Sequence, residues 1–519
     1  MVNKSLFELV KSLNKAEKRH VKLYKLDYEN GKGDIYIRFF DELCKCKERA
    51  DATAFIENLS LTKKKLNNLQ NYLYHIILSG LKNFKSEASV DIRLHNLMIE
   101  VNILFEKSLL TQCLKKLERA EEIAARYELT GFQHMIGLLQ ESVHLQMNSL
   151  FFTNPAIKQD GIFKALKIQR KAVQSLVSEV SYRELATGYF SDSSQFSTRK
   201  KATAHLEHLL NNPLIKNVNE QGLSMQAWST LSALRSLAYF FAGKFKEGEV
   251  HTAAQLKTIR EKYFHIAMES PIYWIETIYN YIGYCYYLRD YKKILSLLEE
   301  IKTLLNSKGV TGGGLAETRL WFNYYQYRLV ISVRTARFEN MSTILKEIGS
   351  FLTDHNKFIQ PEYYVSLNYY IAYNLFTKGN YKESIFWLNK IINDPNTDSR
   401  RDYQVQTRVF YFILQVERKN VDMYKTAYDL FTEYLEEKSM QGKFERAFKG
   451  FMKECLDQPE SGIPPKKYLQ KFKKDLEDLK ADETEERKVT QYFDYFSWLE
   501  SKIEKQAFIE VYKRRNNLD

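Results

Sequence analysis

Along most of the chain, apolar residues recur every three or four positions, the spacing of one face of an α-helix. Residues 61–85 are the clearest example, and Thr62 offers a hydroxyl as the N-terminal cap. One face of this segment carries Leu66, Leu69, Leu73, Ile76, Ile77 and Leu81. Residues 1–85 as a whole predict about four helices.

From about residue 90 onwards, the pattern predicts helices in pairs. The segment LFEKSLLTQCLKKLERA at 104–120 can be laid without a gap on LFTKGNYKESIFWLNKI at 375–391, which places Leu110 on Tyr381. In both segments a helix ends and a short turn follows. An apolar or aromatic residue, here called the plug residue, then fills the turn and a second helix starts. Three positions further on, a small residue allows the two helices to approach closely.

The plug residue returns at regular intervals, together with a second aromatic marker. The plug residues are Phe245, Tyr291, Phe338 and Tyr381, at intervals of 46, 47 and 43 residues. The second marker lies 17 residues before each plug residue, at Trp228, Trp274, Trp321 and Tyr364. Internal periods of this size are typical of solenoids, in which stacked helical hairpins bury one another's apolar faces.

The predicted fold is therefore all-α: a right-handed superhelix, or solenoid, of antiparallel helical hairpins. We expect a basic N-terminal helical module at 1–86, a repeat array at 87–440 and a C-terminal helical cap at 441–519. The prolines agree with this reading, since Pro271 and Pro361 stand at expected helix starts, where a missing N–H is tolerated.

The hairpins resemble tetratricopeptide repeats. In YNYIGYCYYLRDY, Gly283, Tyr286 and Tyr291 match the family pattern. In the hairpin that starts at NYYIAYNLF, the matching residues are Ile371, Ala372, Leu375, Gly379, Tyr381, Ser384, Leu388 and Ile391. The period departs from the usual value of about 34 residues. Ile294 and Met341 also stand where the family usually has alanine.

The resemblance implies a concave groove lined by the first helix of each hairpin. Carried over to the two clear hairpins, it implies that Asn280, Tyr284, Tyr369 and Tyr373 face a partner in that groove. An asparagine can both donate to and accept from a peptide backbone, and a tyrosine adds rigid apolar area with a polar tip. The alternative is that these four residues pack between neighbouring hairpins or are merely exposed.

The whole chain also resembles large helical-repeat proteins of bacteria. The features are SLNKAEKRHVKLY near the start, the helix NYLYHIILSGLKNF, the repeats and the closing FDYFSWLESKI. This resemblance supplies no catalytic residues. We expect a non-enzymatic scaffold that binds a protein or peptide in its groove, with the oligomeric state left open.

Charge adds an alternative function. The net charge is +13, and residues 1–85 contribute +7 of it, from 17 Lys and Arg against 10 Asp and Glu. Lys63, Lys64 and Lys65 open a predicted helix and could contact the phosphates of a nucleic acid. The chain would then be a transcriptional or signalling regulator whose repeats sense a partner. The ordinary explanation is a solvated lysine cluster, and no helix-turn-helix pattern is evident.

The remaining features favour a soluble cytoplasmic protein without a cofactor. The five cysteines form no disulfide framework, and no apolar run is long enough to span a membrane. His205 and His208 share a helical face, but no third metal ligand is placed by the sequence. The glycines at 312–314 lack the lysine and the preceding strand of a phosphate loop. We therefore expect no catalytic, cofactor-binding or metal-binding residues and no membrane partner.

Overall fold

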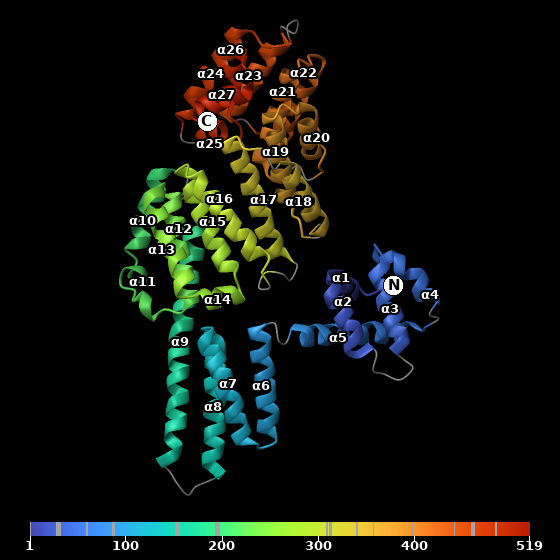
Figure 1. Ribbon diagram of the computed structural model, residues 1–519, viewed down its shortest axis with the longest axis vertical. Coiled ribbons are helices and arrows are strands. Elements are labelled where there is room, and N and C mark those ends of the chain that lie inside the picture. The colour runs from blue at the N-terminus through green and yellow to red at the C-terminus, as the bar shows by residue number, and fades with distance from the viewer. Residues whose placement is uncertain are drawn as a thin grey trace. The chain divides into compact units, whose positions relative to one another are not determined.

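In the computed structural model the described part of the chain is built from helices, without a strand (Figure 1). The described residues are 2–26, 33–58, 61–85, 89–150, 156–191, 198–307, 310, 314–338, 341–355, 358–395, 398–440, 442–457, 462–482 and 485–518. The all-α prediction is therefore confirmed for these residues, and the superhelical course of the array stays a prediction. The predicted module boundaries fall on residues 86–88 and 441, which lie outside the described residues.

The chain forms two compact units. The first unit consists of Met1–Gly188, Val218–Leu231 and Tyr263–Glu269. The second unit consists of Tyr189–Asn217, Ser232–Lys262 and Ser270–Asp519.

The first unit begins with a small helical cluster. Its helices are α1 (Lys4–Ser12), α2 (Lys15–Val21), which continues as a π-helical turn (Lys22–Leu26), α3 (Gly33–Lys45), α4 (Thr53–Asn58) and α5 (Lys63–Lys85). The predicted helix at 61–85 is confirmed, because Leu73 and Ile77 are fully buried and Thr62 accepts a hydrogen bond from the Lys65 N–H at 3.4 Å. Phe39 and Phe40 of α3 complete this core.

The next four helices of the chain are longer. They are α6 (Val90–Glu106), α7 (Leu110–Arg126), α8 (Thr130–Leu150) and α9 (Ala156–Ser191). Leu110 is buried at the first position of α7, as the alignment with Tyr381 predicts. Short helix α14 (Phe264–Glu269) belongs to the same unit, where His265 bonds the Arg126 carbonyl oxygen at 2.9 Å.

The second unit contains a series of helical hairpins, although the first helix of the series belongs to the first unit up to Leu231. They are α12 (Met225–Phe241) with α13 (Phe245–Glu261), α15 (Ile272–Tyr287) with α16 (Tyr291–Leu305), α17 (Leu315–Thr335) with α18 (Met341–Asp354), α19 (Pro361–Thr377) with α20 (Tyr381–Ile392), and α21 (Arg401–Glu417) with α22 (Asp422–Glu437). Each of these hairpins packs on the next in chain order, as Figure 1 shows from α15 to α22. Phe245, Tyr291 and Tyr381 each open the second helix of a hairpin, as predicted.

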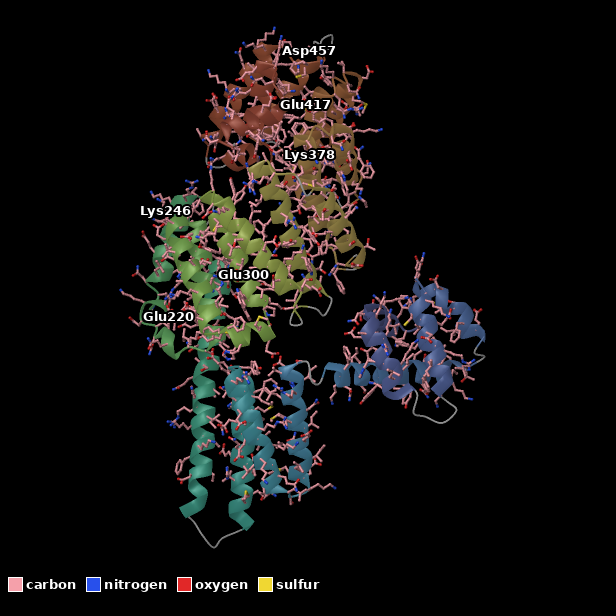
Figure 2. The ribbon with its side chains drawn as sticks, viewed as in Figure 1. Glu220, Lys246, Glu300, Lys378, Glu417 and Asp457 are labelled. Carbon is pink, nitrogen blue, oxygen red and sulfur yellow. The ribbon has the colours of Figure 1, made fainter. Side chains whose placement is uncertain are left out.

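Helices outside the hairpins complete the second unit. They are α10 (Arg199–Leu210), α11 (Pro213–Lys216), α23 (Lys443–Leu456), α24 (Lys466–Lys480), α25 (Glu486–Thr490), α26 (Tyr495–Glu504) and α27 (Phe508–Arg515). Glu417 at the end of α21, labelled in Figure 2, accepts hydrogen bonds from the Trp498 indole and the Lys502 ammonium, both at 2.8 Å. These two bonds fasten α26 to the last hairpin.

The hairpin turns share one backbone device. Two residues before the plug residue the backbone is left-handed, with φ of +58° at Ser108, +71° at Gly243, +60° at Arg289, +52° at Ala336 and +77° at Gly379. After α15, the Arg289 N–H donates to the Tyr286 carbonyl oxygen at 3.1 Å, and the Asp290 N–H donates to the Cys285 carbonyl oxygen at 2.8 Å. This bond pair is the Schellman cap, which satisfies carbonyls left over at a helix end.

The plug residues and the small residues after them pack against first helices, both within a hairpin and between neighbouring hairpins. Phe245 stacks on Tyr287 with ring centroids 4.4 Å apart. Three positions later, the ring of Tyr284 lies where a Cβ on Gly248 would stand. In the α19–α20 hairpin the matching small residue is Ser384, whose hydroxyl donates to the Ala372 carbonyl oxygen at 2.8 Å. The tryptophan marker is also anchored, because Trp274 donates its indole N–H at 3.0 Å to Glu300, which is labelled in Figure 2.

Candidate functional site

A groove of about 890 Å³ crosses the first helices of consecutive hairpins in the second unit. Its walls come from α12, α15, α17 and α19, with contributions from α10, α25 and Asn516, which follows α27 (Phe508–Arg515). Helix α17 supplies five of the lining residues, namely Asn323, Gln326, Tyr327, Val330 and Arg334.

The lining residues follow one register relative to the plug residues. Asn280, Tyr327 and Tyr370 lie eleven residues before their plug residues, Gly283 and Val330 lie eight before, and Phe241, Tyr287 and Arg334 lie four before. Offsets of three and seven positions share one face of a helix. Successive hairpins therefore turn the same face of their first helices towards the groove.

Three side-chain amides of the groove have no hydrogen-bond partner inside the described protein. They belong to Asn280 on α15 and to Asn323 and Gln326 on α17, and all three side chains are partly exposed. Each amide carries a carbonyl acceptor and two N–H donors. The groove therefore presents donors and acceptors that can bond with the main chain of a ligand.

Some aromatic residues of the groove are held in place by a hydrogen bond or by stacking, and others are exposed. Tyr279 is buried, and its hydroxyl donates to the Leu320 carbonyl oxygen at 2.6 Å. Tyr327 stacks on Tyr279 with ring centroids 5.8 Å apart. Desolvation raises the pKa of Tyr327 to about 12, so its hydroxyl is neutral at pH 7. Phe241 and Tyr287 are 41% and 53% exposed and supply apolar contact area.

The chain's own C-terminal segment lies against the corresponding face of α19 and α21. Between α25 and α26, the Asp494 N–H donates to the Tyr373 hydroxyl at 3.1 Å, and the ring of Phe493 lies 5.1 Å from the ring of Tyr373. Nearby, the Gln406 amide donates to the Lys488 carbonyl oxygen at 3.4 Å. Tyr373 lies eight residues before its plug residue, the same position as Gly283 and Val330.

Of the four residues proposed to face a partner, the structure brings one to the groove. Asn280 lines it, whereas Tyr284, Tyr369 and Tyr373 are buried, with exposed fractions of 1%, 0% and 4%. Tyr284 reaches back to α12 and donates its hydroxyl to the Ser236 carbonyl oxygen. Tyr369 packs against Tyr403 and Phe410 of α21, at centroid distances of 5.2 and 5.8 Å. Three of the four residues thus take the alternative role of packing between hairpins.

The sequence reasoning missed the contribution of α17. The family resemblance was carried over only to the two clearest hairpins, so Tyr327 and Arg334 were not proposed. The spacing from the plug residues could have identified this contribution. Counting eleven residues back from Phe338 gives Tyr327, the counterpart of Asn280.

The lysines proposed for nucleic-acid contact lie in the first unit. Lys63, Lys64 and Lys65 are exposed in the first turn of α5, which carries no acidic residue. Contact of these lysines with a nucleic acid stays a prediction.

Comparison of the chain with protein families, curated proteins and solved structures finds no match. None of the described helices is long and apolar enough to cross a membrane. Within the described ranges, no three residues among His, Cys, Asp and Glu are grouped so that they could hold a metal ion.

Proposed function

We propose that this protein is a non-enzymatic scaffold that binds a segment of a protein or peptide in the groove of the second unit. The observation that carries the proposal is the set of amides on Asn280, Asn323 and Gln326, which make no hydrogen bond within the described protein. Amides of this kind suit a ligand with regularly spaced backbone N–H and C=O groups, which every extended peptide has.

The C-terminal segment supplies an example of such binding within the chain. On α19 and α21, a tyrosine hydroxyl and a glutamine amide already hold backbone groups of Asp494 and Lys488. The aromatic side chain of Phe493 enters the adjoining core. A partner segment on α15 and α17 would use the same helix face with the same kinds of contact.

The test is selection of random peptides by the intact protein, followed by affinity measurements on the enriched peptides. We expect Asn280→Ala combined with Asn323→Ala to weaken binding at least about tenfold, or about 1.4 kcal/mol. The melting temperature should stay unchanged, because neither amide makes an internal hydrogen bond among the described residues.

The matched control is Lys257→Ala on α13, a second helix, where the lysine side chain is 73% exposed. This variant should bind like the unaltered protein. Equal affinity of the double variant and the control would sink the proposal, as would a failure of the unaltered protein to enrich any peptide.

A further inference from the structure

Arg334 is a cation of the groove that has no anionic partner in the described protein. It lies partly buried in the last turn of α17. Its Nε–H donates to the Tyr286 hydroxyl at 2.8 Å, and one terminal nitrogen donates to the Gln491 carbonyl oxygen at 3.5 Å. A guanidinium has five N–H donors, so these two bonds leave others for a ligand. Charged groups that are withdrawn from water are usually paired with an opposite charge.

The lining as a whole has an excess of positive charge. It contains Arg199, Arg289 and Arg334 but only one carboxylate, Glu486. That carboxylate lies 3.8 Å from Arg199, on the side of α10 and α25. The part of the groove between α15 and α17 is therefore positive, and it favours a ligand that carries a negative charge.

We infer that the groove binds an extended internal stretch of a partner and that Arg334 holds an acidic side chain of that stretch. This inference rests on the proposed function and specifies its ligand. Arg334 belongs to the row of residues four positions before the plug residues, together with Phe241 and Tyr287. A bound peptide that crosses the first helices runs alongside this row. We therefore expect the row to contact side chains of the peptide. The guanidinium geometry matches a carboxylate through paired N–H donors.

The same row also predicts a second feature of the ligand, an apolar residue near the acidic one. Tyr287 on α15 is 53% exposed, so its ring offers apolar area to a ligand although one face stacks on Phe245. Packed helix axes lie about 8–10 Å apart, and an extended chain advances about 3.3 Å per residue. The ligand should therefore carry an apolar residue about three positions from its acidic one.

The experiment is a selection of random peptides by the full-length protein, with the peptides fused to a carrier at both ends so that they have no free carboxyl terminus. A parallel selection uses Arg334→Gln, and Arg337→Gln serves as the matched control, because Arg337 is exposed and does not line the groove. We expect the unaltered protein and Arg337→Gln to enrich Asp or Glu with an apolar neighbour about three positions away. Arg334→Gln should lose the acidic enrichment.

A second measurement remains valid if Arg334→Gln lowers the stability of the protein. One selected peptide is made with an amidated end and with its acidic residue changed to the corresponding amide. That change should weaken binding to the unaltered protein roughly tenfold and leave binding to Arg334→Gln unaltered. The affinities of the acidic peptide and of its amide form are compared on the same protein. A smaller fraction of folded Arg334→Gln therefore affects both affinities equally and does not change their ratio.

The possible outcomes separate this inference from the proposed function. Enrichment without acidic residues, or an equal effect of the peptide change on both proteins, would overturn the role of Arg334 while groove binding stands. Enrichment of acidic ligands only when a library with free carboxyl ends is used would also overturn it, in favour of a terminal carboxylate. If the unaltered protein enriches no peptide at all, the proposed function itself fails.

Discussion

At the scale of single residues, side chains one turn apart on α15 have different surroundings. Asn280 faces the groove, whereas Tyr284 points towards α12 and α13 and packs over Gly248. The two positions are four residues apart, which turns the side chain by about 40° around the helix. That rotation is enough to move a side chain from the groove row into the contact between hairpins. Both side chains are polar at their tips, so composition alone does not separate them.

The buried tyrosine hydroxyls lead to a prediction about stability. The Tyr369 hydroxyl is buried and has no hydrogen-bond partner among the described residues, whereas the Tyr284 hydroxyl donates to the Ser236 carbonyl oxygen. We expect Tyr369→Phe to leave the free energy of unfolding unchanged or to raise it by up to about 1 kcal/mol. Tyr284→Phe should lower it by about 1 kcal/mol.

Denaturant unfolding of both variants provides the measurement, since the two substitutions remove the same atom. A loss of stability of similar size in both variants would show that the Tyr369 hydroxyl is satisfied in solution.

At the scale of elements, the formation of each hairpin depends on the backbone conformation of its turn. Each turn places a residue in the left-handed region two positions before the plug residue, but only Gly243 and Gly379 are glycines among the five plug turns described above. Non-glycine residues at Ser108, Arg289 and Ala336 adopt the same conformation against a steric preference of about 1–2 kcal/mol. The bond pairs of the Schellman cap and the packing of the plug residue offset this strain.

The turns at Gly379 and Ala336 form a matched pair for mutation. An added Cβ at Gly379 would meet no atom within 4 Å, so Gly379→Ala tests backbone strain without a clash. We expect it to lower the free energy of unfolding by about 1 kcal/mol. Ala336→Gly should raise it by about 0.5 kcal/mol, because relief of strain exceeds the added freedom of the unfolded chain.

Thermal and denaturant unfolding of the two variants measure the sign of each change in the free energy of unfolding. Opposite signs are the expected result, and destabilisation by Ala336→Gly would mean that its turn is not strained.

At the scale of the whole chain, the described groove ends where the chain's own C-terminal segment covers the following helices. Phe493 is 2% exposed and contacts Tyr373, Phe376, Phe410 and Phe508. The segment therefore closes the core of α19 and α21, whereas the groove remains open along α15 and α17. The predicted C-terminal helical cap at 441–519 stays a prediction.

The importance of this segment can be measured by truncating one ring. Phe493→Ala should lower the free energy of unfolding of the second unit by about 3–5 kcal/mol, because it leaves a cavity among four other rings. The control is Phe386→Ala on α20, where the ring is 56% exposed and the cost should stay below about 1 kcal/mol.

Denaturant unfolding followed by circular dichroism distinguishes the two variants. Similar small costs for both would mean that the segment is not packed into the unit in solution.

The amino-acid sequence by itself determined the helices, the hairpin turns and the plug register of this protein. These features depend on residues within a few positions of one another, through apolar spacing and helix caps. Tertiary structure alone decided which face of each first helix is open. Tyr373 and Asp494, for example, meet across 121 positions of the chain, and no local pattern encodes that contact. The same holds for Arg334, whose isolation from every described carboxylate follows from how α15, α17 and the C-terminal segment pack around it.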